Sequence, residues 1–288
     1  MASASARSLR RPEFVSPPAP PRARPFLKWA GGKTQLLGEI LARVPKRFGT
    51  YHEPFLGGGA VFFALTPARA ILSDVNADLI GTYTAVRDDV DALVRELTHH
   101  AAEEEHFYQV RAQQPAMMSD VASAARTIFL NRTCFNGLYR VNRRGEFNVP
   151  FGRYANPTIC DVGNLTAASK ALGHVELRVE SVFDMGTRVR RGDFVYLDPP
   201  YDPVSKTASF TSYAQHGFGR QEQARLADLF RELARRGAYV LLSNSDTKLI
   251  NDLYKDFHIE RVYARRAINA RADRRGPVSE VLVRSWRA

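Results

Sequence analysis

The sequence predicts an α/β fold with an open parallel sheet. Short apolar runs typical of buried strands alternate with helical patterns, and several of these runs end in an acidic or polar residue beside glycine or proline. Strands are predicted to begin near Tyr51 and Ala70 and to cover 175–180, 194–197, 239–242 and 280–284. The carboxyl ends of parallel strands meet along one edge of a sheet, where ligands bind. The candidate functional residues are therefore expected along that edge.

Composition restricts the class of protein and of partner. The 288 residues are enough for one large domain or for a catalytic domain with an insertion. A formal net charge of +11 favours a polyanion or an anionic surface as partner. Two cysteines are too few for a disulfide framework or a structural zinc site, and they indicate a reducing cytosol. No apolar run reaches the roughly 18 residues of a membrane span, so we expect no membrane partner.

The first 24 residues differ from the rest of the chain. Residues 1–24 are rich in Ala, Ser, Pro and Arg, and cannot bury enough apolar surface to offset the entropy of ordering. We predict a disordered tail. An organellar transit peptide and a mis-assigned start codon stay open as alternatives.

Two glycine segments follow the tail. In residues 25–34, Gly31 and Gly32 precede a helical pattern, and Trp29 and Lys33 supply a stacking face and a cation. The spacing excludes a Walker phosphate loop, and an ordinary helix start with a core Trp is the alternative. A second loop, Gly57-Gly58-Gly59, lies between a strand and a helix and allows close contact with a nucleoside-like ligand.

The next predicted strand ends in an acidic residue, Asp74, which is placed to accept hydrogen bonds from both ribose hydroxyls of such a ligand. Taken alone, Asp74 could equally cap the following helix. Apolar residues from Asp78 to about Leu97 then follow a helical period, which indicates core packing. Three histidines among three glutamates at 99–106 have no repeated ligand spacing, so we predict a solvated helix face there and no metal site.

Residues 126–153 combine six arginines with asparagine and aromatic residues, against the single acid Glu146. This mixture offers phosphate binding, hydrogen bonding to base edges and stacking in one segment. It predicts a DNA-contacting hairpin, with a basic surface loop around a structural Asn-Gly turn as the alternative.

The predicted strand at 194–197 leads directly into Asp198-Pro199-Pro200-Tyr201. Neither proline has an N–H group to donate, so the strand must end abruptly. The turn places the Asp198 carboxylate beside a fixed backbone carbonyl, and this pair of acceptors suits a flat amine group, with Tyr201 near enough to stack on its ring. Further along the chain, residues 221–233 predict an amphipathic helix, and Ser243-Asn244-Ser245-Asp246 is expected after the strand at 239–242.

Five stretches, taken in order, resemble the Dam-type family of DNA adenine N6-methyltransferases, which includes GATC-specific enzymes that act alone or in restriction–modification systems. They are residues 28–33, 53–59, 73–76, 131–152 and 198–201. The resemblance extends from about Pro25 to Trp286. It implies a Rossmann-like S-adenosylmethionine-dependent methyltransferase sheet with an inserted, mainly helical DNA-recognition domain that carries a β-hairpin. On this basis residues 25–81 and 172–288 form the catalytic domain, residues 82–171 the target-recognition domain, and residues 1–24 the tail.

The resemblance also implies roles for single residues. Catalysis is expected at Asp198, Pro199, Pro200 and Tyr201, and S-adenosylmethionine binding at Trp29, Lys33, Gly57, Gly58, Gly59, Asp74 and Asp198. DNA contacts are expected at Arg132, Phe135, Asn136, Leu138, Arg140, Arg144 and Pro150. Many relatives carry tyrosine at the position of Phe135, which keeps the stacking face and loses the hydroxyl. No metal ion is expected in the site.

The reaction that the resemblance implies is methyl transfer to the N6 amine of a flipped-out adenine in double-stranded DNA, within GATC. The Asp198 carboxylate and the Pro199 carbonyl would each accept a hydrogen bond from one N–H group of the amine. This would free the nitrogen lone pair for attack on the methyl group. Tyr201 would stack on the extruded base. GATC itself comes from the resemblance and not from the geometry of base contacts.

Other interpretations stay open. Related strand-end motifs begin with Asn in enzymes that methylate protein glutamine and often with Ser in cytosine-amine methyltransferases, and Asp198 favours adenine. RNA adenine is an alternative substrate, and a DNA-binding protein without catalysis is an alternative class. The resemblance implies a cytoplasmic, nucleoid-associated protein of bacterial or phage origin. A cognate restriction endonuclease encoded nearby is the partner expected in a restriction–modification system.

Overall fold

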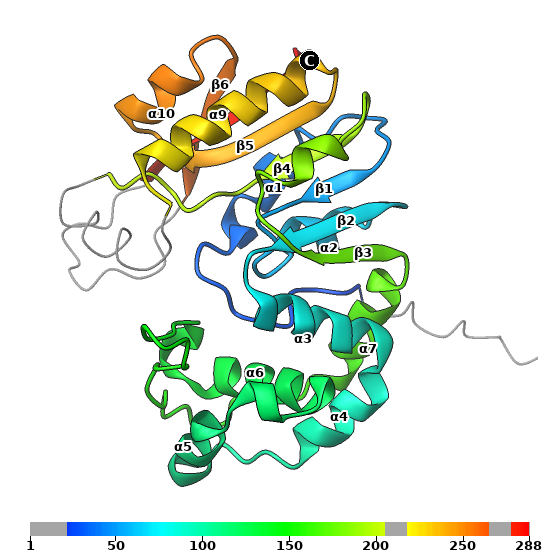
Figure 1. The fold of residues 1–288 in the computed structure, drawn as a ribbon, viewed down its shortest axis with the longest axis vertical. Helices are drawn as coiled ribbons and strands as arrows, with labels where there is room; N and C mark the ends of the chain where they lie inside the picture. The colour runs from blue at the N-terminus through cyan, green and yellow to red at the C-terminus, as the bar shows by residue number, and fades with distance from the viewer. Residues whose placement is uncertain (1–21, 205–217, 265–277, 288) are drawn as a thin grey trace, which may run out of the picture.

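The computed structural model describes residues 22–204, 218–264 and 278–287, so nearly all of the predicted tail lies outside the described residues. A seven-stranded sheet runs through the molecule in the order β3-β2-β1-β4-β5-β7-β6 (Figure 1). The strands are β1 (Tyr51–Glu53), β2 (Ala70–Asp74), β3 (Val175–Val179), β4 (Phe194–Leu197), β5 (Tyr239–Ser245), β6 (His258–Ala264) and β7 (Val278–Arg284). This is an open, mainly parallel sheet of the Rossmann-like kind that was predicted.

The first five strands of that order pair in parallel, and β7 is antiparallel to both of its neighbours, β5 and β6. Because β1, β2, β4 and β5 all run in one direction, the residues that follow them gather at one edge of the sheet. That edge carries Asp74 after β2 and Asp198 after β4. The sheet thus brings together residues that lie more than a hundred positions apart in the sequence.

Helices cover both faces of the sheet. They are α1 (Leu37–Leu41), α2 (Ala60–Leu65), α3 (Ala77–Asp88), α4 (Val90–Thr98), α5 (Glu104–Ala112), α6 (Asp120–Thr133), α7 (Val162–Leu172), α9 (Arg220–Arg235) and α10 (Lys248–Leu253). Short 3-10 helices are η1 (Lys33–Gln35), η2 (Pro115–Met117), η3 (Phe135–Gly137) and η4 (Met185–Thr187). Within the described parts of the chain, no helix is long and apolar enough to cross a membrane.

The core explains why β4 is apolar at every position. Phe194 and Tyr196 enter one core cluster together with residues of α1, α2 and α3. Val195 and Leu197 enter the other cluster, on the opposite face, with residues of α9 and α10. A strand buried on both faces shows a continuous apolar run instead of alternation.

Helices α4 to α6 lie beyond α3 and α7, past the β3 end of the sheet, as Figure 1 shows. Ala124, Ala125 and Ile128 of α6 join the same core cluster as the sheet residue Leu72. A separate apolar cluster links α5 and α6 to the segment that follows them, through Phe107, Phe129 and Phe147 among others.

Polar side chains define where several of these helices begin. Asn76 Oδ1 accepts a hydrogen bond from the Leu79 N–H at 3.0 Å and caps α3, and Ser119 Oγ accepts one from the Ala122 N–H at 3.2 Å and caps α6. Asp89 Oδ1 likewise accepts one from the Ala92 N–H at 3.2 Å and caps α4.

The helical period predicted over 78–97 is confirmed, and it is divided between two helices, because α3 ends at Asp88 and α4 begins at Val90. Asp89 adopts an extended φ of −146° and acts as an N-cap, which interrupts the helix without disturbing the apolar spacing. The structure also extends β5 to Ser245, so Ser243 and Asn244 lie inside the strand and not after it. β6 was not predicted.

Candidate active site

Asp198 directly follows β4 and is held by a cation and a hydroxyl group. Lys33 Nζ lies 2.8 Å from Asp198 Oδ1, and the Ser243 hydroxyl donates a hydrogen bond to the same oxygen at 2.9 Å. The Tyr196 hydroxyl lies 2.9 Å from Ser243 Oγ and extends this chain of contacts into the core. Burial raises the pKa of the Asp198 carboxyl above its usual value, against the opposing influence of the Lys33 ammonium and the two hydrogen bonds.

Tyr201 lies on the other side of the same lysine. Its ring centroid is 4.7 Å from Lys33 Nζ, within the range of a cation–π contact, and its hydroxyl donates a hydrogen bond to Glu280 Oε2 at 2.8 Å. Pro199 is buried and Pro200 is half-buried. The structure thus brings Lys33 together with both ends of the predicted catalytic turn.

Lys33 opens η1 and is 7% exposed. A buried lysine requires partners, and Lys33 has three: the Asp198 carboxylate, the Tyr201 ring and the Gly31 carbonyl, which accepts a hydrogen bond at 2.6 Å. Trp29, the other residue of this segment that is predicted to bind the cofactor, lies against Gly57. Trp29 and Lys33 therefore both contact other residues of the predicted site.

The glycine loop after β1 is built on two left-handed backbone conformations. Gly57 has φ +47° and Gly59 has φ +66°, and an added Cβ would lie 2.8 Å from Trp29 Cδ1 at the first position and 2.8 Å from the Tyr83 hydroxyl at the second. Both positions therefore require glycine. At Gly58 an added Cβ would meet only ordinary contacts, the nearest at 3.5 Å.

Asp74 contacts this loop through its carboxylate. Its Oδ2 accepts a hydrogen bond from the Gly57 N–H at 3.2 Å, and its Oδ1 accepts one from the Asn76 N–H at 3.0 Å. Asn76, and not Asp74, caps α3, so the alternative reading of Asp74 as the helix cap is wrong. Asp74 instead fixes the glycine loop at the carboxyl end of β2.

Sequence reasoning missed Glu53, which lies among these groups at the end of β1. It is 3% exposed, and Tyr51 donates a hydrogen bond to its Oε2 at 2.8 Å. Burial raises the pKa of Glu53 to about 8, with a further contribution from the charge of Asp198. The only signal in the sequence was its position at the end of a strand directly before the glycine loop.

The residues present fit S-adenosylmethionine. The glycine loop gives close approach to backbone, Asp74 supplies carboxylate oxygens of the kind that bind ribose hydroxyls, and Asp198 supplies an anion for a cationic ligand. Trp29 offers less open stacking surface than we expected, because its ring is half-buried and stacks on Tyr139 with centroids 5.1 Å apart.

The predicted DNA hairpin follows α6 and protrudes as an irregular ribbon. Two isolated antiparallel bridges, Cys134 to Phe151 and Val141 to Phe147, join its two sides. Phe135 and Leu138 are 52% and 37% exposed, so both apolar side chains are accessible on the surface of the ribbon. The other exposed members of the predicted set are Asn136, Arg140, Arg144 and Pro150.

Arg140 and Arg132 differ in how they are held. Arg140 is exposed, and its guanidinium group donates to the side chain of Asn148 at 2.7 Å and to the Asn148 carbonyl at 3.2 Å. Arg132 is half-buried on α6, and its buried Nε has no hydrogen-bond partner among the residues that the structure describes. Burial also lowers the pKa of Arg132. The structure therefore separates Arg132 from the exposed residues of the ribbon.

A buried amide joins the ribbon to the Trp29 segment. Asn131, which is 1% exposed, accepts a hydrogen bond from the Lys28 N–H at 2.8 Å and donates to the Lys28 carbonyl at 2.7 Å. It also donates to the Gly137 carbonyl at 3.0 Å. Asn131 thus helps to hold the ribbon predicted to contact DNA against the segment predicted to bind the cofactor.

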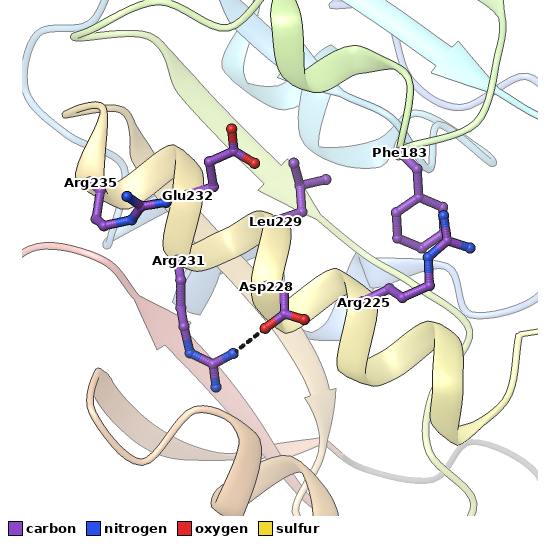
Figure 2. Close-up of a pocket in the computed structure, with 7 residues that line it drawn as sticks. All are labelled: Phe183, Arg225, Asp228, Leu229, Arg231, Glu232 and Arg235. Carbon is purple, nitrogen blue, oxygen red and sulfur yellow. Dashed lines mark hydrogen bonds and ion pairs between the residues drawn. The ribbon is translucent and has the colours of Figure 1, made fainter.

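Figure 2 shows a pocket along α9. Its lining consists of Phe183, Arg225, Asp228, Leu229, Arg231, Glu232 and Arg235. Arg225 lies 4.0 Å from the Phe183 ring centroid, and Arg231 pairs with Asp228 at 2.7 Å. No residue predicted for catalysis, cofactor or DNA lines this pocket.

Comparison with known proteins identifies the family to which the chain is similar. The family described as D12 class N6 adenine-specific DNA methyltransferase matches residues 29–268. The chain is 41% identical over 271 residues to the type II methyltransferase M1.LlaDCHI of Lactococcus lactis subsp. cremoris, which covers 91% of this chain and 95% of that protein.

Two further relatives are similar along nearly their whole length. The type II methyltransferase M.MjaIII of Methanocaldococcus jannaschii is 43% identical over 286 residues, covering 91% of this chain and 99% of its own. The DNA adenine methylase of Escherichia coli K12 is 39% identical over 263 residues, covering 90% of this chain and 94% of its own. The chain therefore belongs to the D12 class of N6 adenine-specific DNA methyltransferases.

Proposed function

We propose that this protein methylates the N6 amine of a flipped-out adenine within GATC in double-stranded DNA, and that Asp198-Pro199-Pro200-Tyr201 performs the reaction. The observation that carries this assignment is the environment of Asp198. Its side chain is 18% exposed and lies at the carboxyl end of β4. Lys33 and Ser243 both contact Oδ1, which leaves Oδ2 as the oxygen that would accept a hydrogen from the amine.

The residues of this chain supply the binding and orientation that the reaction needs. The Asp198 carboxylate and the Pro199 carbonyl each accept a hydrogen bond from one N–H group of the amine. These two hydrogen bonds free the lone pair of the nitrogen. Tyr201, fixed by Glu280 and Lys33, stacks on the extruded base. Trp29, Lys33, Asp74 and the glycine loop hold S-adenosylmethionine. When bound, S-adenosylmethionine supplies an electrophilic methyl group on a sulfonium cation.

The helical part of the chain, residues 82–171, is proposed to read the DNA. Its ribbon offers exposed apolar side chains for wedging between bases and exposed arginines for phosphates and base edges. Arg140 is held by Asn148, which pre-orients its guanidinium group for a bidentate contact with guanine. Arg132, half-buried on α6, would contact DNA only at its outer guanidinium atoms.

The proposed setting is the nucleoid of a cytoplasm, where double-stranded DNA and S-adenosylmethionine meet. The relatives named above include both type II methyltransferases and a DNA adenine methylase, so a solitary enzyme and the partner of a restriction endonuclease are both compatible with the family. A cognate endonuclease is proposed for the second case, and the genes beside this one would identify it.

The test is transfer of labelled methyl groups from S-adenosylmethionine to matched duplexes. One duplex contains GATC, a second replaces its adenine, a third scrambles the site, and an RNA duplex of the same sequence serves as the fourth. We expect label only in the first duplex, and recovery of N6-methyladenine from it after digestion. Transfer to adenine in another sequence would contradict only the GATC specificity. Transfer to the RNA duplex, or no transfer to any of the duplexes, would contradict the proposed substrate.

A further inference from the structure

Two buried amide side chains lie behind the catalytic turn and touch neither the predicted cofactor residues nor the DNA residues. Gln223 is on α9 and is 1% exposed, and Asn244 is on β5 and is 0% exposed. Buried amides of this kind are costly unless each of their polar atoms has a partner. Their partners therefore indicate what they do.

The contacts form a relay that ends on the backbone of the turn. Gln223 Nε2 donates to the Pro200 carbonyl at 2.8 Å, and Gln223 Oε1 accepts from Asn244 Nδ2 at 3.2 Å. Asn244 Oδ1 accepts from the Asp202 N–H at 3.0 Å and from the Ser245 N–H at 2.8 Å. The relay thus holds one backbone group on each side of Tyr201.

The chemistry of the end partners fixes the orientation of both amides. The Pro200 carbonyl can only accept, so the nitrogen of Gln223 must face it. The N–H groups of Asp202 and Ser245 can only donate, so the oxygen of Asn244 must face them. Because Pro199 and Pro200 have no N–H group, the turn lacks two backbone donors that could otherwise fix it, and side chains must supply the hydrogen bonds.

Neighbouring residues of β5 act on the two halves of the site. Ser243 donates to Asp198 Oδ1, and the next residue, Asn244, points to the other face of the strand and reaches Asp202 and Gln223. β5 therefore holds the carboxylate from one face and the backbone after Tyr201 from the other.

We propose that Gln223 and Asn244 are positioning residues for methyl transfer: their buried relay sets the backbone on both sides of Tyr201, and thereby the Asp198 carboxylate and the Tyr201 ring against the target base. This rests on the proposed function. A displacement of about 1 Å in such a site costs about 100-fold in rate. Loss of the relay is therefore expected to lower kcat by about that factor while KM for S-adenosylmethionine and Kd for DNA change less than about twofold.

Gln223→Glu tests the hydrogen bond to Pro200 through its protonation state. An ionised carboxylate only accepts and would face the Pro200 carbonyl, whereas a protonated carboxyl group donates one hydrogen bond and accepts another, as the native amide does. Burial raises the pKa of such a group. We expect the single-turnover rate of the variant, divided by that of the wild type at the same pH, to be about 0.01 at high pH and to rise at least about tenfold on acidification.

Two further variants complete the experiment. Gln221→Glu adds the same charge to an exposed position in the first turn of α9, and its rate relative to the wild type should stay near one at every pH. Gln223→Met keeps the volume and removes both hydrogen bonds, so its rate should fall by about 100-fold with no recovery on acidification. Thermal melting of each variant identifies any that fails to fold.

The outcomes separate this proposal from the proposed function. A wild-type protein that transfers no methyl group to DNA would overturn both. With an active wild type, a Gln223→Glu rate that is equally reduced at every pH, or Gln223→Met activity at the wild-type level, would overturn the relay alone. A loss confined to KM for S-adenosylmethionine or to Kd for DNA would do the same.

Discussion

Glu53 and Asp198 are two carboxyl groups at one edge of the sheet, and the charge of Asp198 contributes to the raised pKa of Glu53. Glu53 has a hydroxyl partner, Tyr51, whereas Asp198 has a cation, Lys33, directly beside it. Burial raises the pKa of both groups, and for Glu53 it reaches about 8. The carboxyl group without a directly bound cation therefore keeps its proton near neutral pH.

This difference predicts a pH dependence of stability for Glu53. Below its ordinary pKa of 4.5 the group is protonated in both the folded and the unfolded chain. Between 4.5 and about 8 only the folded chain keeps the proton, so the free energy of unfolding falls as pH rises, by at most about 1.4 kcal/mol per pH unit from this group. Above about 8 this contribution has been lost.

Glu53→Gln removes the titration and keeps an acceptor for the Tyr51 hydroxyl. The free energy of unfolding of the variant, minus that of the wild type, should increase with pH between about 5 and about 8 and level off above that range. Urea unfolding at several pH values measures it. Parallel pH dependences for the two proteins would show that Glu53 does not carry the raised pKa.

At the scale of elements, the ribbon after α6 and the cofactor segment are joined by Asn131 and by the stacking of Trp29 on Tyr139. The ribbon is therefore anchored at its base, while Phe135, Leu138 and Arg140 remain exposed. An anchored base with exposed contact residues suits a segment that reads DNA without moving relative to the cofactor.

Arg140→Ala should lower sequence discrimination. A bidentate contact to guanine contributes about 1–3 kcal/mol, so kcat/KM on GATC should fall by about 5- to 160-fold relative to sites with one changed base pair. Arg143→Ala is the matched control, because Arg143 is exposed on the same ribbon. This substitution is expected to weaken binding to all duplexes equally. Equal discrimination by Arg140→Ala and the wild type would contradict the assigned role.

Elements differed in how well the sequence predicted them. β4 was predicted at its observed bounds, because a strand buried on both faces is apolar throughout and two prolines end it. The break between α3 and α4 was missed, because Asp89 caps the second helix without interrupting the apolar spacing. β6 was missed because its exposed and charged residues, such as His258 and Arg261, hide a strand at the edge of the sheet.

The candidate site shows the same division. Asp198, Lys33 and the glycine loop were found because their residue types and their places beside a strand or a helix are visible locally. Ser243 and Asn244 were expected at the same edge of the sheet as Asp198, but not with their observed partners. Glu53 and Gln223 gain their importance from burial and from partners in the folded chain, which local sequence does not show. Exposure of the ribbon residues likewise depends on tertiary packing.

At the scale of the whole molecule, the sheet places the proposed catalytic residues along one edge, and the helical part carries the ribbon that is proposed to contact DNA. The net charge of +11 adds a general attraction for DNA that does not depend on sequence. Affinity for DNA and catalysis are therefore expected to rest on different residues and to be separable by mutation.

The most direct test of the account is methyl transfer by Asp198→Ala under saturating S-adenosylmethionine and GATC duplex, beside Asp256→Ala, which removes an exposed carboxylate. We expect the transfer rate of Asp198→Ala to fall by at least about 10²- to 10³-fold, with DNA affinity close to the wild type, and Asp256→Ala to be fully active. The melting temperature of Asp198→Ala should fall, because the buried Lys33 loses its carboxylate partner. Substantial transfer by a folded Asp198→Ala protein would contradict the assignment of this edge of the sheet as the active site.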